Sequence, residues 1–182
     1  FIQVLSNVEH VSLGRSHSLA LKTDGSVWAT GRNDEYQYGD GTNTGTNNWI
    51  QVHTGNVIQV EAAWNNSYIL KSDGSLWVTG ENSYKQLGTG DDITVQSWQK
   101  VITSGVVQIS AAQTHTLILK NDGSVWGCGY GYEGAFGDGV TNERASYSEL
   151  ITQNIVQISA GGNQIVVDGS IQGAIGFSSA LR

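Results

Sequence analysis

The sequence predicts an all-β protein: a β-propeller built of four-stranded antiparallel blades, with about four blades' worth of strands in the chain. Three observations support this prediction. A sequence frame repeats without gaps, each copy contains four short strand patterns, and an Asp-Gly turn joins the two central strands of each copy. A charged fraction of only 14% and 24 glycines also favour strands and turns over helices.

One short motif marks the repeated frame. It reads DGSVW at Asp24–Trp28, DGSLW at Asp73–Trp77 and DGSVW at Asp122–Trp126, so the spacing is 49 residues twice (73 − 24 and 122 − 73). Glycines keep the same frame further along each copy, at Gly31, Gly80 and Gly129. A gap-free match of this length indicates supersecondary units that stack to bury their apolar faces.

Each copy contains four strand patterns, which are clearest in the second copy. They lie at Val57–Ala62, Ser67–Lys71, Ser75–Gly80 and Ser97–Val101. The middle pair is joined by an Asp-Gly turn, which is the strongest short-range signal of a hairpin because glycine tolerates a positive φ. These strands are apolar on both faces, as expected of a sheet sandwiched between two other sheets.

The frame divides the chain into repeats. They cover about residues 7–55, 56–104, 105–153 and a shortened fourth copy at 154–182, and we expect 1–182 to form a single propeller segment. We also count the strands on either side of the short turn at Thr54-Gly55 as a pair.

The two ends of the chain carry partial copies. Phe1–Val4 repeats the pattern of Trp49–Val52, so the strand at residues 1–5 is expected to belong to a blade shared with the C-terminus or with another chain. The last hairpin, Gln164–Gly176, has Gln172 where the other copies have tryptophan.

Composition argues against several functional classes. The chain has 9 basic and 16 acidic residues, a net charge of −7, and such a surface repels phosphates, so we expect no nucleic-acid partner. No apolar run approaches the roughly 20 residues that a membrane-spanning helix needs, so we expect no membrane insertion. The lone Cys128 rules out an internal disulfide framework. A secreted or extracellular location is favoured.

The repeats resemble those of the regulator of chromosome condensation family. The resemblance is carried by Val11–Gly41, Val60–Gly90 and Ile109–Gly139, through D-G-S-V-W, H-x-L-x-L and G-x-N-x-x-x-Q-x-G. It implies a propeller, usually of seven blades, and a scaffold that serves many partners: some members act in nucleotide exchange on a small GTPase, and others inhibit secreted bacterial enzymes by direct contact. Several positions depart from the pattern, namely Ala63, Ala112, Asn66, Gln164, Gly131 and Ala135.

Residues that recur at one position are expected to be structural. His17 and His115 share a position and are expected to bond the backbone of a neighbouring strand, since a catalytic or metal-binding role would not recur in this way. The recurring tryptophans are expected to act as wedges between blades. They are Trp28, Trp77 and Trp126.

No constellation in the sequence supports an enzyme. A loop at Asp40–Gly45 loosely resembles a calcium loop but lacks the final bidentate acid. Cys128 lies in a strand pattern and is interpreted as a small buried residue. No phosphate-binding loop, dinucleotide fingerprint or nucleophile elbow occurs, so we expect no catalytic residue, no metal and no cofactor.

The residues that escape the repeat lie in two kinds of loop. In an antiparallel blade, the turn before the histidine-type strand and the long loop after the tryptophan strand fall on the same face, opposite the Asp-Gly turn. Tyrosine, tryptophan and arginine are common anchors of interfaces, although surface loops also simply drift in sequence. The candidate binding residues are Arg15, Trp64, Gln113, Glu35, Tyr36, Tyr84, Lys85, Tyr132 and Glu133.

These features predict a non-enzymatic module that binds another protein through its loop-rich face. Two alternatives remain open: a carbohydrate-binding, lectin-like propeller that stacks sugars on Trp64 and Tyr132, and a structural spacer of a larger surface protein. A homo-oligomer that completes the propeller ring is a further expected association, because open strand edges invite pairing.

Overall fold

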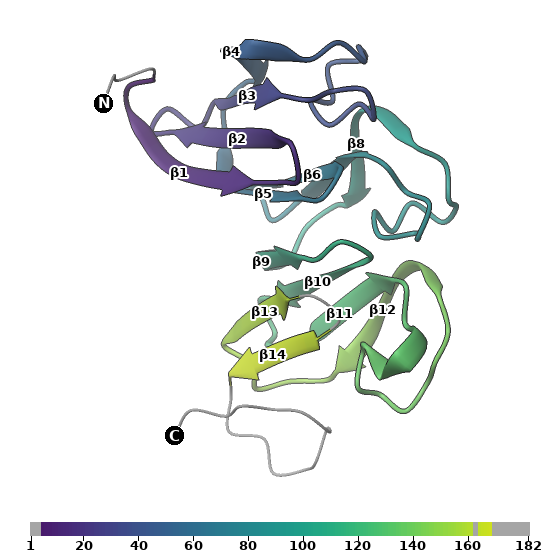
Figure 1. Ribbon diagram of the computed structural model, residues 1–182. Coiled ribbons are helices and arrows are strands. Elements are labelled where there is room, and N and C mark those ends of the chain that lie inside the picture. The colour runs from purple at the N-terminus through teal and green to yellow at the C-terminus, as the bar shows by residue number, and fades with distance from the viewer. Residues whose placement is uncertain (1–4, 162–163, 169–182) are drawn as a thin grey trace. The chain divides into compact units, whose positions relative to one another are not determined.

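The computed structural model describes residues 5–161 and 164–168 (Figure 1). Within these ranges the regular structure is β-sheet, apart from one short 3-10 helix, η1 (Tyr132–Gly134). The predictions made for Phe1–Val4 and for Gln172 lie outside the described residues, as does the end of the last hairpin.

The strands form three four-stranded antiparallel sheets and one two-stranded sheet. The first sheet contains β1 (Val8–Leu13), β2 (His17–Lys22), β3 (Val27–Gly31) and β4 (Thr46–His53). The second contains β5 (Val57–Ala63), β6 (Asn66–Lys71), β7 (Leu76–Gly80) and β8 (Val95–Ile102). The third contains β9 (Val106–Ala111), β10 (His115–Lys120), β11 (Val125–Gly129) and β12 (Arg144–Ile151). The hairpin of β13 (Gln157–Gly161) and β14 (Gln164–Asp168) follows. The prediction of an all-β fold made of four-stranded antiparallel blades is confirmed.

Turn chemistry explains why the central strands of each sheet pair. Gly25, Gly74 and Gly123 have φ values of 75°, 75° and 79°, a left-handed conformation that glycine adopts without steric cost. The aspartate before each glycine accepts a hydrogen bond from the backbone N–H two residues later, at 2.9 Å in all three turns. The hydroxyl of the serine two residues later and this backbone N–H together lower the pKa of Asp24, Asp73 and Asp122, which favours the ionised carboxylates.

The pairing expected across the short turn at Thr54-Gly55 is wrong. β4 is hydrogen-bonded to β3, and β5 is hydrogen-bonded to β6, so the two strands that flank this turn belong to different sheets. The turn therefore carries the chain from the last strand of one sheet to the first strand of the next sheet. A repeat period identifies equivalent strands, but it does not identify which strand edges bond.

The chain divides into two compact units, which are described separately. Residues 1–81 with 94–104 form the first unit, and residues 82–93 with 105–182 form the second. The loop at 82–93, between β7 and β8, thus groups with the second unit although the sequence frame assigns it to the second repeat. The boundaries predicted from the frame and the single propeller segment at 1–182 stay predictions.

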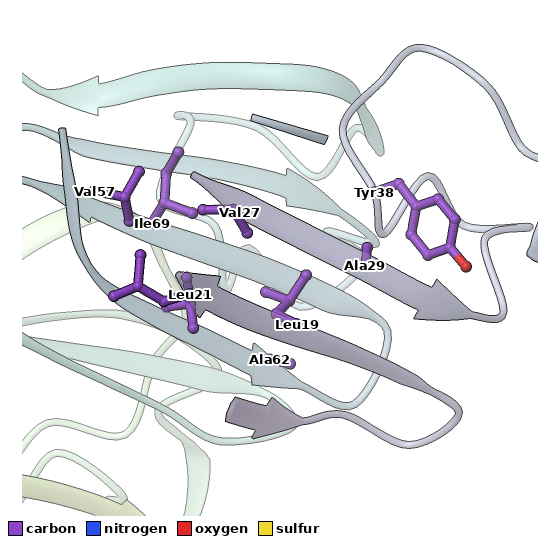
Figure 2. Packing of buried hydrophobic residues seen from close by; sticks show 9 residues of the cluster. Leu19, Leu21, Val27, Ala29, Tyr38, Val57, Ala62 and Ile69 are labelled. Carbon is purple, nitrogen blue, oxygen red and sulfur yellow. The ribbon is translucent and has the colours of Figure 1, made fainter. Parts of the chain in front are cut away.

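The core of the first unit is a layer between its two sheets. Leu19, Leu21, Val27 and Ala29 of the first sheet pack against side chains of the second sheet, and Tyr38 closes the layer at one side (Figure 2). The partners on the second sheet are Val57, Val60, Ala62 and Ile69. Full burial of each such aliphatic side chain stabilises the fold by about 1.5–3 kcal/mol, so this layer holds the two sheets together.

The second unit repeats this layer with equivalent residues. Leu117, Leu119, Val125 and Phe136 pack against Ile155 and Ile158. They lie 98 residues after Leu19, Leu21, Val27, Tyr38, Val57 and Val60, which is twice the repeat spacing (117 − 19). Each layer is also crossed by one equivalent hydrogen bond: Ala62 N–H donates to Ser12 Oγ at 2.9 Å, and Ala160 N–H donates to Ser110 Oγ at 2.8 Å.

One apolar strand of the first unit is not covered in this way. Val11 and Leu13 on β1 are 46% and 70% exposed, whereas their equivalents on β5, Val60 and Ala62, are 0% and 6% exposed. β1 and β5 thus have apolar residues at equivalent positions, but only those of β5 are buried against another sheet.

Candidate functional site

The long loops of the first two sheets are held rigidly from within. The buried Asn33 side chain donates to the carbonyl oxygen of Thr42 at 2.8 Å and accepts from the N–H of Tyr38 at 2.9 Å. In the next repeat the buried Asn82 donates to the carbonyl oxygen of Asp91 at 2.9 Å and accepts from the N–H of Leu87 at 2.9 Å. Because each asparagine joins three points of its loop, both loops present their exposed residues from fixed backbones.

A glutamine in each loop sets the position of the candidate residues. Gln37 Oε1 accepts from the N–H of Glu35 at 3.0 Å, and Gln86 Oε1 accepts from the N–H of Tyr84 at 3.0 Å. The next residues, Tyr36 and Lys85, both adopt φ 61°, which strains a side chain larger than glycine. The third loop lacks this asparagine and glutamine, and η1 replaces the turn.

In the first unit the structure brings Arg15 and Trp64 together. The Arg15 guanidinium lies 4.5 Å from the centre of the Trp64 ring, and Arg15 N–H donates to the Trp64 carbonyl oxygen at 2.9 Å. The two residues are equivalent in the repeat (64 − 15 = 49), so the contact joins the same turn of two sheets of one unit. Trp64 is 37% exposed and has φ 52°.

The other candidates in the first unit contribute less exposed surface. Glu35 and Tyr36 are half-buried, and the carbonyl oxygen of Tyr36 accepts a hydrogen bond from Thr79 Oγ1 at 2.8 Å. Arg32 and Asp34 form an ion pair in the same loop. Glu35 and Asp40 are the other charged residues of this loop.

In the second unit three tyrosines form a cluster. The ring of Tyr84 meets that of Tyr130 edge to face, with centres 5.8 Å apart, and the rings of Tyr130 and Tyr132 are tilted with centres 4.8 Å apart. Tyr84 and Tyr132 are 38% and 46% exposed. We call Tyr84, Tyr130 and Tyr132 the tyrosine cluster.

Two ion pairs of the described residues involve the loops of this cluster, Lys85–Glu143 and Arg144–Asp138. Lys85 Nζ is 2.6 Å from Glu143 Oε2. The hydrogen bond and charge of Glu143 raise the pKa of Lys85, and Asp92 adds to this effect at longer range. Gln113 is exposed in the turn after β9, and the Glu133 side chain is outside the described part of the chain.

Tyr130, the centre of the tyrosine cluster, was not among the residues predicted from the sequence. Its position nevertheless varies between repeats, which read Arg32, Glu81 and Tyr130. The same criterion that selected Trp64 would have found it.

The two recurring histidines are buried and neutral. Burial lowers the pKa of His17 and of His115 to about 4. His17 Nε2 lies 2.9 Å from Ser67 Oγ, a side-chain partner and not the expected backbone group. The His115 ring meets the ring of Phe136 edge to face at 5.9 Å, and neither His115 nitrogen has a hydrogen-bond partner within the described ranges.

The recurring tryptophans are half-buried. In each case the indole Nε1–H donates to the hydroxyl of the serine two residues earlier, at 3.1 Å for Trp28, 3.0 Å for Trp77 and 2.9 Å for Trp126. A lysine lies over each ring: Lys22, Lys71 and Lys120 respectively. Trp77 packs against the core of the first unit, and a second lysine, Lys100, also lies over its ring at 5.2 Å from the centre.

Other potentially reactive groups do not assemble into a site. Cys128 is fully buried, and burial raises its pKa, so it remains a thiol. Among residues 5–161 and 164–168, no three His, Cys, Asp or Glu side chains are grouped closely enough to hold a metal ion. A cavity of about 340 Å³ is lined by residues of β1, β2 and β5, namely Glu9, His10, Leu21, Ile58, Gln59 and Glu61. In the part of the chain that the structure describes, no helix has the length and apolar character to cross a membrane.

Comparison with known families gives two matching sequence profiles. Both describe the Regulator of chromosome condensation (RCC1) repeat; one matches residues 8–37 and 106–135, and the other matches residues 73–119. Together they cover about half of the chain. A search of the curated proteins found no match.

Solved structures share the fold at low sequence identity. The chain is similar to human WBSCR16, with TM-score 0.79, 24% identity, and coverage of 91% of this chain and 47% of that one. It is also similar to Prp20p from Saccharomyces cerevisiae, which was solved together with a study of its binding to Gsp1p and histones, with TM-score 0.75, 20% identity, and coverage of 91% and 44%. The chain thus spans less than half the length of these solved relatives.

Proposed function

The chain belongs to the regulator of chromosome condensation repeat family. We propose that it is a non-enzymatic module that binds another protein through two kinds of loop: the turns before the histidine-type strands and the long loops after the tryptophan strands. The observation that carries this proposal is the rigid presentation of exposed aromatic side chains. Trp64, Tyr84 and Tyr132 are 37–46% exposed. Tyr84 extends from the loop that the buried Asn82 ties down, and Trp64 lies in a short turn whose carbonyl oxygen accepts a hydrogen bond from Arg15 N–H. Rigid aromatic anchors lose little conformational entropy on binding.

Protein binding by relatives adds support at the level of partner class. Prp20p, whose structure this chain resembles, was studied for binding to Gsp1p and histones. The chain covers only 44% of that protein, so the identity of those partners is not carried over. Nucleotide exchange is a narrower possibility that we do not favour, since no insertion interrupts the 49-residue frame between Asp24 and Asp122 (73 − 24 and 122 − 73).

A carbohydrate-binding role has less support from the side chains themselves. Sugar stacking needs an open aromatic face, and Arg15 lies over the face of Trp64 at 4.5 Å. The tyrosine cluster is the remaining stacking platform, so a lectin function would depend on the second unit.

The proposal can be tested by selecting binders from a displayed random-peptide library, with a glycan array run in parallel. We expect selected peptides to lose at least tenfold in affinity against Trp64→Asn or Tyr132→Ala. Asparagine is chosen at position 64 because it tolerates the left-handed backbone there. Thr23→Ala and Ser72→Ala, which change exposed residues at the Asp-Gly turns, are the matched controls.

The two arms of the test separate the functional classes. Peptides whose affinity depends on Trp64 or on the tyrosine cluster support protein binding. Peptides that respond equally to the control substitutions contradict the proposed surface, and array binding without peptide binding would favour the lectin alternative. No binder in either arm would favour the structural spacer.

A further inference from the structure

The tyrosine cluster differs from the recurring tryptophans and from Trp64 in its lack of a cation over the rings within the described residues. A lysine or arginine of the chain lies over Trp28, Trp64, Trp77, Trp126 and Phe136, at 3.6–4.9 Å from the ring centre for the nearest cation. Within the described residues, none lies over Tyr84, Tyr130 or Tyr132. Tyr84 and Tyr132, which are 38% and 46% exposed, are therefore accessible to a cation from a partner.

The charges around the cluster favour the same ligand. The loop at 82–93 carries Asp91 and Asp92, both exposed, and neither forms an ion pair within the part of the chain that the structure describes. The ammonium of Lys85, which interacts with Tyr132, is bound to Glu143 at 2.6 Å. Asp91, Asp92 and Glu143 thus outnumber Lys85 by two negative charges in the loops that carry the cluster, while Arg144 is balanced by Asp138.

Aromatic faces and carboxylates attract cations by additive effects. The quadrupole of a tyrosine ring attracts a cation above its face by about 0.5–1 kcal/mol at an exposed site. A guanidinium can also stack on the ring while its N–H groups donate to a carboxylate in the plane of the guanidinium, which an ammonium does less well. Arginine is therefore the side chain that this arrangement fits best.

We propose that the tyrosine cluster, together with Asp92 and Glu143, binds an arginine side chain of a basic partner segment. This inference rests on the proposed function, since it names the partner chemistry for one part of that surface. It concerns residues of the second unit alone, so it does not depend on the Arg15–Trp64 pair.

The probe is an acetylated and amidated heptapeptide in which three arginines alternate with glycines. Its control contains citrulline, which keeps the shape of arginine and removes the charge. We expect the arginine peptide to bind at least tenfold more tightly than the citrulline peptide in calorimetric titrations at constant salt. Tyr132→Ala should reduce the affinity about tenfold, and Tyr132→Phe should retain it because the ring remains.

Charge variants distinguish a local site from the overall negative charge. Glu143→Gln should weaken arginine binding severalfold, while Glu9→Gln, which removes one equal charge from an exposed position on β1, should leave it unchanged. Lys85→Asn should strengthen binding, because it removes a competing cation and releases Glu143. Thermal melting of each variant establishes that it is folded.

Three results would overturn the inference: equal binding of the two peptides, unchanged binding to a folded Tyr132→Ala, or equal losses from the two glutamate substitutions. Library peptides that lack arginine and depend on Trp64 would leave the proposed function intact while contradicting this site. The two proposals can therefore fail separately.

Discussion

The first strands of the two sheets in the first unit carry the same apolar positions in different environments. On β5, Val60 and Ala62 are buried against Leu19 and Leu21 of the first sheet. On β1, the equivalent Val11 and Leu13 face solvent within this structure. The comparison teaches that the repeat determines which side chains share a face, whereas a neighbouring sheet determines whether that face is buried.

The sharpest test of this comparison uses two leucines of one hairpin. Leu19→Ala should destabilise the first unit by about 2–5 kcal/mol, because Leu19 is fully buried in the layer between the sheets. Leu13→Ala, on the adjacent strand but 70% exposed, should change stability by less than about 0.5 kcal/mol. Urea unfolding of both variants measures the difference, and equal losses would mean that the face of β1 is covered in solution.

Acidification should destabilise the first unit through the buried His17. Its pKa is lowered to about 4 in the fold, against about 6.5 in an unfolded chain, so the unfolded state binds more protons between these values. The contribution of His17 is therefore complete above pH 6.5 and declines as the pH falls toward 4, by up to roughly 3 kcal/mol.

His17→Asn isolates this effect. Asparagine occupies the equivalent position in the second repeat, at Asn66, so the substitution retains a side chain that the fold accepts. Unfolding measured at pH 7.5 and pH 4.5 should show a smaller acid loss in the variant than in the unchanged protein. A variant that loses as much stability as the unchanged protein would refute a buried neutral imidazole as the cause.

The tryptophans extend the comparison from aliphatic to aromatic side chains. Trp77 packs on the core of the first unit, whereas Trp28, its equivalent on the first sheet, does not contact that core. Trp77→Ala should thus cost more than Trp28→Ala, about 2–3 kcal/mol against about 1 kcal/mol, both below a fully buried truncation because the rings are half-buried. Chemical denaturation gives both values, and a larger loss for Trp28 would contradict this order.

The smallest expected change in stability concerns the contact between Arg15 and Trp64 in the turns of the first two sheets. Arg15→Ala removes the cation over Trp64 and should cost about 0.5–1 kcal/mol, as exposed cation–π contacts do. Arg15→Lys should recover part of this energy. The change in melting temperature measures the loss, and a loss as large as that of Leu19→Ala would indicate that the turn contributes to the core.

Local chemistry accounts for what the sequence could predict. The second sheet was expected at Val57–Ala62, Ser67–Lys71, Ser75–Gly80 and Ser97–Val101, and its strands lie within one or two residues of these bounds. Asp-Gly turns fix such hairpins through neighbouring residues alone. The β4–β5 pairing was wrong because bonding between strand edges depends on the path of the chain between sheets.

The candidate site was harder to predict because it depends on contacts between repeats. Variation within the frame selected Arg15, Trp64 and Tyr84, but it did not indicate that Arg15 would lie over Trp64. Tyr130 was missed although its position varies in the same way. Contacts between equivalent loops depend on how closely neighbouring sheets pack. A single sequence does not determine the distance between two such loops.

The D-G-S-x-W motif has a direction that follows from its donors and acceptors. The Trp28 indole can only donate, and the ionised Asp24 carboxylate can only accept. The single hydroxyl proton of Ser26, 2.6 Å from Asp24 Oδ1, must therefore point to the aspartate, which leaves an oxygen lone pair for the indole. Ser124 is held in the same way between Asp122 and Trp126. The negative charge of the aspartate thus fixes the direction of two successive hydrogen bonds, from tryptophan to serine and from serine to aspartate. The second acceptor position on the serine favours the ring orientation in which the indole N–H points to it.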